Sequence, residues 1–180
     1  MLRATITLIG MMGAGKTAVG TELARLCGVP FRDSDAEIEH AATMTIPEIF
    51  ARDGEAFFRD REAEVLARLL KGQPMVLSVG GGAWLRPANR ALIRGAGVTV
   101  WLDAPAAVLW GRIKGRGNRP LLATPNPRAT LEALLAERRP AYAEADLTVT
   151  SDAGDTVETT ARAVRRAVEA HAPELFGVRA

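Results

Sequence analysis

Four short, almost continuously apolar runs recur along the chain, and the stretches between them return to apolar residues every three or four positions. Such runs are typical of strands buried on both faces of a parallel sheet, and the intervening spacing is typical of amphipathic helices. The runs are ATITLI, MVLSV, VTVWL and LTVT. The segment VPFRD, which Pro30 introduces, is expected to add an edge strand or a second strand. The alternation predicts an α/β fold in which helices cover a parallel sheet.

Helices are expected between these runs, at residues 16–26, 35–42, 46–52, 55–70, 87–95, 105–114, 127–143 and 155–171. The segment GRGNRPLLATPNP, residues 115–127, combines glycine, proline and arginine between two of these helices. It is long for a plain connection in a compact domain, so it is either a lid or a disordered loop.

Length and charge narrow the class of protein. The 180 residues suit one domain, and no apolar run approaches the length of a membrane span. The first ten residues lead straight into a glycine-rich loop, unlike a signal peptide, so we expect a cytoplasmic protein. The 23 Lys and Arg nearly balance the 21 Asp and Glu, which argues against nucleic acid as a partner. Cys27 is the only cysteine and is expected to be a small core residue.

The stretch GMMGAGKT, residues 10–17, matches the phosphate-binding pattern G-x-x-x-x-G-K-[ST] at every fixed position. A strand precedes it and a helix follows, so backbone N–H groups can close around phosphate oxygens at the positive helix N-terminus. Lys16 would reach the β- and γ-phosphates, and the Thr17 hydroxyl would ligate Mg²⁺. A turn of small residues would not need Lys and Thr in this register. GTPase motifs and the L-S-G-G-Q motif of transport ATPases are absent, which favours a small-molecule kinase.

Two carboxylates follow the predicted second strand in FRDSDAEIE. They stand at the carboxyl edge, where open α/β sheets bind ligands. Asp33 and Asp35 can therefore face different partners, one Mg²⁺ and the other an acceptor hydroxyl. Helix capping by Ser34 or Asp35 is an equally good interpretation.

Two further stretches allow a structural and a functional interpretation. In FFRDREAEVLARLL, Arg59 and Glu62 lie three apart, which by default is a surface ion pair. Functionally, Glu62 would orient Arg59 as a fork for a substrate carboxylate. In VGGGAW, residues 79–84, three glycines follow a strand, which indicates either a tight turn or close approach of another group to the backbone.

Six stretches stand in this order along the chain: GMMGAGKT, DSD, FFRDRE, GGG, NRPLL and ERRPAY. Through these stretches the chain resembles shikimate kinase over about residues 5–150. The resemblance implies a three-layer α/β/α P-loop kinase fold with a five-stranded parallel sheet, one domain over residues 1–180. It further implies a mobile lid at about 112–125 and a shikimate-binding helical region at about 33–62. The implied enzyme is a monomeric phosphotransferase with an alcohol acceptor, which converts shikimate and ATP, with Mg²⁺, into shikimate 3-phosphate and ADP on the route to chorismate and aromatic amino acids.

Carried over residue by residue, the resemblance assigns catalysis to Lys16, Asp35 and Arg119. It assigns ATP binding to Gly13, Ala14, Gly15, Lys16, Thr17, Ala18, Arg112 and Arg119. It assigns shikimate binding to Asp35, Arg59, Gly80, Gly81, Gly82 and Arg138. It assigns Mg²⁺ binding to Thr17 and, through water, to Asp33. Arg138 is preferred to Arg139 because the family's arginine stands four residues before the tyrosine of ERRPAY, and Arg119 is expected to reach the transferred phosphate.

Some stretches depart from the family pattern. Val79 stands where the family often has a small polar residue, TSDAGDT lacks an arginine that some members place against adenine, and residues 174–180 match nothing and are expected to fray. A gluconate or nucleoside-monophosphate kinase would share the fold and the P-loop. A non-catalytic ATP-binding module would keep Lys16 but show no acceptor-dependent release of ADP.

Overall fold

The computed structural model describes residues 2–115 and 120–177. Five parallel strands form one sheet in the order β2-β3-β1-β4-β5. They are β1 (Thr5–Ile9), β2 (Phe31–Asp33), β3 (Val76–Ser78), β4 (Gly97–Asp103) and β5 (Leu147–Thr150). Every residue of β1 and β3 is buried, as their continuous apolar runs predict. The segment VPFRD supplies β2, which is both the second strand in the chain and an edge of the sheet.

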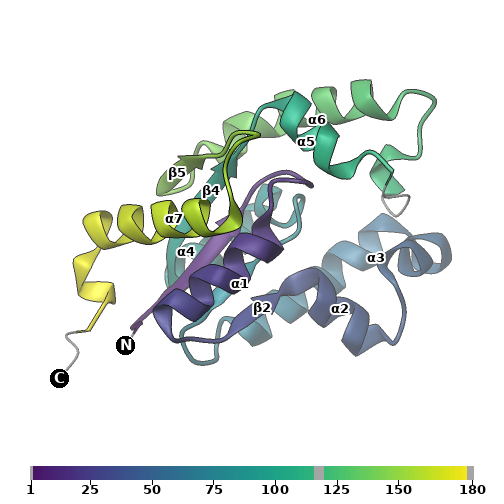
Figure 1. The fold of residues 1–180 in the computed structure, drawn as a ribbon. Helices are drawn as coiled ribbons and strands as arrows, with labels where there is room; N and C mark the ends of the chain where they lie inside the picture. The colour runs from purple at the N-terminus through teal and green to yellow at the C-terminus, as the bar shows by residue number, and fades with distance from the viewer. Residues whose placement is uncertain (1, 116–119, 178–180) are drawn as a thin grey trace.

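Helices cover both faces of this sheet, so the predicted α/β class is confirmed (Figure 1). The α-helices are α1 (Lys16–Cys27), α2 (Ser34–Ala42), α3 (Ile46–Leu69), α4 (Pro87–Ala96), α5 (Ala106–Ile113), α6 (Pro127–Tyr142) and α7 (Val157–His171). Helices α1 and α7 pack side by side on one face, and α4 lies on the other (Figure 1). Short 3-10 turns, which the periodicity does not reveal, form η1 (Ala83–Leu85), η2 (Pro120–Leu122) and η3 (Pro173–Leu175).

The two helices predicted at 46–52 and 55–70 are the two halves of α3, which bends at Gly54. Gly54 has φ 82° and ψ 173°, a conformation that suits glycine alone. The bend places the ring centroids of Phe50 and Phe58 4.9 Å apart. A small core of Ile38, Ile49, Phe58 and Val65 then holds α2 and α3 together, apart from the core of the sheet.

The expectation that the chain frays from residue 174 is wrong for its first part. Glu174 and Leu175 belong to η3, and Phe176 forms an antiparallel bridge with Leu2. The Arg3 N–H donates to Leu175 O at 2.9 Å, so this stretch is held against the residues just before β1. Residues 178–180 lie outside the described part. Within 2–115 and 120–177, no helix is long and apolar enough to cross a bilayer.

Candidate active site

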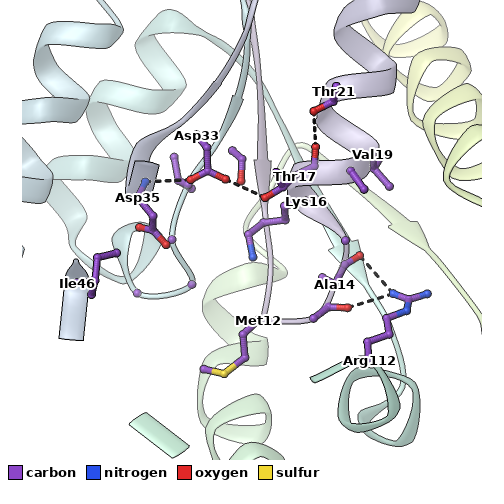
Figure 2. A pocket seen from close by; sticks show the side chains of 18 of the residues that line it. Met12, Ala14, Lys16, Thr17, Val19, Thr21, Asp33, Asp35, Ile46 and Arg112 are labelled. Carbon is purple, nitrogen blue, oxygen red and sulfur yellow. Dashed lines mark hydrogen bonds between the residues drawn. The ribbon is translucent and has the colours of Figure 1, made fainter. Parts of the chain in front are cut away.

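A cleft of about 1060 Å³ lies against the loops that follow β1, β2 and β3. The chain leaves β1 toward one edge of the sheet and later returns to its other side with β4, so this is a topological switch point, where α/β proteins bind ligands. Figure 2 shows the cleft from close by, with the β1–α1 loop, Asp33 and Asp35 facing it.

The loop between β1 and α1 has the geometry of a phosphate cradle. Gly13 and Gly15 have φ of 81° and 89°, a left-handed conformation that turns successive N–H groups to one side. At Gly13 a Cβ would also lie 2.8 Å from the Ile113 side chain, so only glycine fits. The Lys16 Nζ donates to Gly10 O at 2.8 Å and to Met11 O at 2.9 Å, which holds the ammonium group over the loop.

Thr17 and Asp33 face each other across the cleft floor (Figure 2). The Thr17 hydroxyl donates to Asp33 Oδ2 at 2.9 Å, while Asp33 Oδ1 accepts from the backbone N–H of Asp35 at 3.0 Å and of Ala36 at 3.4 Å. Asp33 is therefore the N-cap of α2, and the expectation that Ser34 or Asp35 caps this helix is wrong. A hydroxyl and a carboxylate oxygen at this spacing fit Mg²⁺, which takes few protein ligands and keeps waters and phosphate oxygens.

Because Asp33 caps the helix, the carboxylate of Asp35 is left to enter the cleft (Figure 2). Burial raises the pKa of Asp35 to about 6, with a further contribution from the negative charge of Asp33. Lys16 and Arg59 act in the opposite direction and favour the ionised form. Asp35 is thus a carboxylate between two cations, close to the phosphate cradle.

Arg59 is held by a carboxylate that solvent does not reach. Its Nη1 donates to both oxygens of Glu62 at 3.1 and 3.0 Å, and its Nη2 donates to Glu55 at 3.2 Å. Glu62 is 0% exposed, so the default interpretation of a surface ion pair is wrong. Burial raises the pKa of Glu62 to about 6, although the charge of Arg59 opposes the rise. This pair fixes the direction of the guanidinium group toward the cleft.

The glycine triplet makes room for the side chains around it. A Cβ on Gly80 would lie 2.8 Å from Asp35 Oδ1, and one on Gly82 would lie 2.5 to 2.7 Å from the guanidinium of Arg59. One on Gly81 would lie 3.1 Å from Arg138 Nη1. The triplet also forms a turn, in which the Ala83 N–H donates to Gly80 O at 3.0 Å, but none of its glycines has a positive φ. Close approach therefore explains all three.

The two adjacent arginines of ERRPAY diverge. Arg138 is 6% exposed and lines the cleft, and within the described residues its Nε has no hydrogen-bond partner. Arg139 instead pairs with both oxygens of Asp103 at 3.1 Å and lies over the Trp101 ring. The positions favour Arg138 as the cleft residue, in line with the preference drawn from the tyrosine spacing.

Comparisons with known proteins agree with this geometry. The family model described as shikimate kinase matches residues 12–169. The chain belongs to the shikimate kinase family. A shikimate kinase of Cereibacter sphaeroides is 60% identical over 93% of this chain and 83% of its own length. The structure of shikimate kinase from Acinetobacter baumannii in complex with shikimate shares 39% identity with a TM-score of 0.90, over 94% of each chain. A gluconokinase of Sinorhizobium meliloti, at 20% identity and a TM-score of 0.61, shares the fold.

In this member of the family, Arg112 lies beside the phosphate cradle (Figure 2). Its Nη1 donates to Gly13 O at 3.2 Å and to Ala14 O at 3.4 Å, and its Nη2 to Asp152 O at 3.5 Å. Arg112 is the first residue of the predicted lid, about 112–125, and Pro120 and Leu121 of η2 in the same segment also line the cleft. Arg119, the expected catalytic arginine, lies outside the described residues.

Some cleft residues were missed by sequence reasoning. Ile46, Pro47 and Phe50 form an apolar wall on the first half of α3, and their apolar spacing gave only a helix signal. Ser151 directly follows β5 and also lines the cleft; its hydroxyl is buried and has no partner among the described residues. No sequence pattern distinguishes such a serine from any other strand end.

Proposed function

We propose that this chain transfers the γ-phosphoryl group of ATP to the 3-hydroxyl of shikimate, which gives shikimate 3-phosphate and ADP. The observation that carries the proposal is that Arg59 and Arg138 meet the phosphate cradle in one cleft, each against a glycine of the triplet. The Acinetobacter baumannii relative, whose structure contains shikimate, supports the choice of acceptor. The product would enter the route to chorismate and aromatic amino acids, and we place the reaction in the cytoplasm.

At the nucleotide end, the N–H groups of residues 13–18 would bind the phosphates of ATP at the start of α1. Lys16 is already held over the loop by two carbonyls and would exchange these for β- and γ-phosphate oxygens. Thr17 would hold Mg²⁺ directly and Asp33 would hold it through water, and the bound ion neutralises charge on the phosphates. Arg112 would lie near the nucleotide, since its guanidinium group donates to two backbone carbonyls of the cradle.

At the acceptor end, Arg59 and Arg138 would bind the carboxylate of shikimate in paired hydrogen bonds. Arg59 is partly neutralised by Glu62, whereas Arg138 is a buried cation whose Nε has no partner in the described part of the chain. A buried cation is costly unless an anion pairs with it, which favours an acid as the substrate. The apolar wall of Ile46, Pro47 and Phe50 would pack against the ring of the acceptor.

Between the two ends, Asp35 would accept a hydrogen bond from the acceptor hydroxyl and orient its oxygen toward the γ-phosphorus. The proton of this hydroxyl passes to the Asp35 carboxylate as the oxygen–phosphorus bond forms in line with the bond that breaks to ADP. No covalent enzyme intermediate is needed. Arg119 would stabilise the moving phosphoryl group from the lid; this role rests on the family resemblance.

The deciding experiment measures ADP release by the purified protein with MgATP, in parallel with shikimate, gluconate, AMP and no acceptor. We expect release that depends on shikimate alone, with ³¹P NMR placing the phosphate on the 3-oxygen. The same assay is run on Asp35→Asn. Its control is Asp60→Asn, because Asp60 is an exposed carboxylate on α3. Release with gluconate or AMP would overturn the assignment of the acceptor. A protein that binds ATP but releases no ADP with any acceptor would be a binding module.

A further inference from the structure

Tyr142 lies behind the cleft, between the glycine triplet and the loop of the phosphate cradle. It ends α6, its side chain is 0% exposed, and its hydroxyl donates to Gly81 O at 2.5 Å. The same hydroxyl lies 3.7 Å from the sulfur of Met11, in the loop that follows β1. One oxygen atom thus contacts the glycine triplet and the phosphate cradle, although Tyr142 takes no part in the chemistry proposed above.

The hydroxyl also lies beside Arg138, one helical turn earlier on α6. A Cβ on Gly81 would meet both Arg138 Nη1, at 3.1 Å, and the Tyr142 oxygen, at 3.3 Å, so the two groups share one point of the backbone. The hydroxyl proton is given to Gly81 O, and its lone pairs remain available to the guanidinium N–H groups. Burial raises the pKa of Tyr142 while the charge and hydrogen bond of Arg138 oppose this, so the hydroxyl stays protonated and keeps donating.

We infer that Tyr142 is a positioning residue that holds the guanidinium of Arg138 against Gly81 in the orientation needed to bind the acceptor's carboxylate. This inference rests on the proposed function, because it concerns the same carboxylate. A planar fork binds a carboxylate well only when its plane is fixed, and a free arginine side chain would lose rotamer entropy on binding. The Tyr142 hydroxyl is a polar group that lies against this guanidinium, whereas the buried Nε of Arg138 has no hydrogen-bond partner among the described residues.

A purely structural role for the hydroxyl is disfavoured by a second fastening at the same place. The Trp84 Nε1 donates to Ala141 O at 2.7 Å and already joins α6 to the turn that follows the glycine triplet. The Tyr142 ring also packs against Trp101, with ring centroids 5.9 Å apart. Both contacts remain when only the oxygen of Tyr142 is removed, so the helix should stay docked.

The test compares Tyr142→Phe with wild type by calorimetry, using shikimate, MgADP and a shikimate analogue whose carboxylate is reduced to a primary alcohol. We expect shikimate to bind about tenfold more weakly to Tyr142→Phe, the scale of one hydrogen bond to a charged group. MgADP and the alcohol analogue should bind both proteins alike. Thr99→Val is the control, because Thr99 is also a buried hydroxyl with a close partner, Asp146, outside the cleft.

Equal affinity of Tyr142→Phe and wild type for shikimate would overturn the inference, as would an equal loss for the alcohol analogue. A wild-type protein that fails to bind shikimate would instead refute the proposed function, so the two failures are distinguishable. Because Tyr142 is the only tyrosine of the chain, ¹³Cζ-labelled tyrosine gives one NMR signal in the wild-type protein. Shikimate should shift this signal and the alcohol analogue should not. A signal unmoved by saturating shikimate would overturn the inference even if Tyr142→Phe failed to fold.

Discussion

The phosphate cradle at the nucleotide end of the cleft comes from one run of consecutive residues, 10–17, whereas the acceptor end gathers Asp35, Arg59 and Arg138 from three different helices. The first end relies on backbone N–H groups and on a lysine that hydrogen-bonds its own loop. The second relies on side chains that are held by a buried carboxylate and by the space above three glycines. A local motif can therefore encode phosphate binding, while recognition of the acceptor depends on the whole fold.

Lys16→Ala should separate the two ends with the largest effect. Removing the ammonium group takes positive charge away from the transferred phosphoryl group, and we expect kcat to fall by on the order of 10³. Arg59 should keep its position, because Glu62 and Glu55 hold its guanidinium group. Steady-state kinetics and calorimetry with shikimate alone check this. A matching loss of shikimate affinity would mean that the two ends are not independent.

Asp35→Asn should reduce kcat by about 10² to 10⁴, the usual contribution of a positioned acid or base. The amide keeps the size of the side chain but cannot take the acceptor's proton. The affinity for MgADP should stay unchanged, because Asp33 and not Asp35 contacts Thr17. Asp60→Asn should leave both quantities as they are in wild type. Near-normal turnover of Asp35→Asn would remove Asp35 from the chemistry and leave it as a neighbour of the cap.

Periodicity and the phosphate-binding motif predicted the sheet, its helices and the cradle, because these depend on local sequence. They could not decide whether Asp35 faces a ligand or caps a helix, since Ser34 and Asp35 were both acceptable N-caps by sequence. The structure decides through Thr17, which lies on another helix and binds Asp33. The burial of Glu62 was equally hidden, because a pair three residues apart looks the same whether water or Gly80 lies above it. The tail was misjudged because Phe176 is fastened by Leu2, at the far end of the chain.

Gly82→Ala tests whether the position of Arg59 depends on the absence of a side chain at Gly82. The added methyl group would lie within 2.5 to 2.7 Å of the Arg59 guanidinium and must displace it. We expect the KM for shikimate to rise by about 10- to 100-fold, since misplacement of about 1 Å can cost 10²-fold, while the KM for ATP stays unchanged. Gly95→Ala is the matched control, because nothing lies within 4 Å of its Cβ position. Equal kinetics of the two variants would mean that the triplet serves only its turn.

The smallest expected effect is on the pH dependence of folding stability, because a buried carboxylate, Glu62, holds Arg59. Glu62 has a pKa of about 6 in the folded chain against 4.5 ordinarily, so the folded state binds this proton more tightly than the unfolded state. The stability that the protonated group contributes is complete below pH 4.5 and is lost as the pH rises to about 6. The gap between the two values corresponds to about 2 kcal/mol.

Glu62→Gln should remove this pH dependence. Urea unfolding between about pH 4 and pH 7 measures the free energy of unfolding of two proteins, Asp35→Asn alone and Asp35→Asn combined with Glu62→Gln. Both carry Asp35→Asn so that titration of Asp35 does not contribute to the difference between them. Glu64→Gln is the control, because Glu64 pairs with Arg61 at the same three-residue spacing but its side chain is 60% exposed. If the difference between the proteins with and without Glu62→Gln did not exceed that of the Glu64→Gln control, burial of the ionised Glu62 carboxylate would cost the fold nothing.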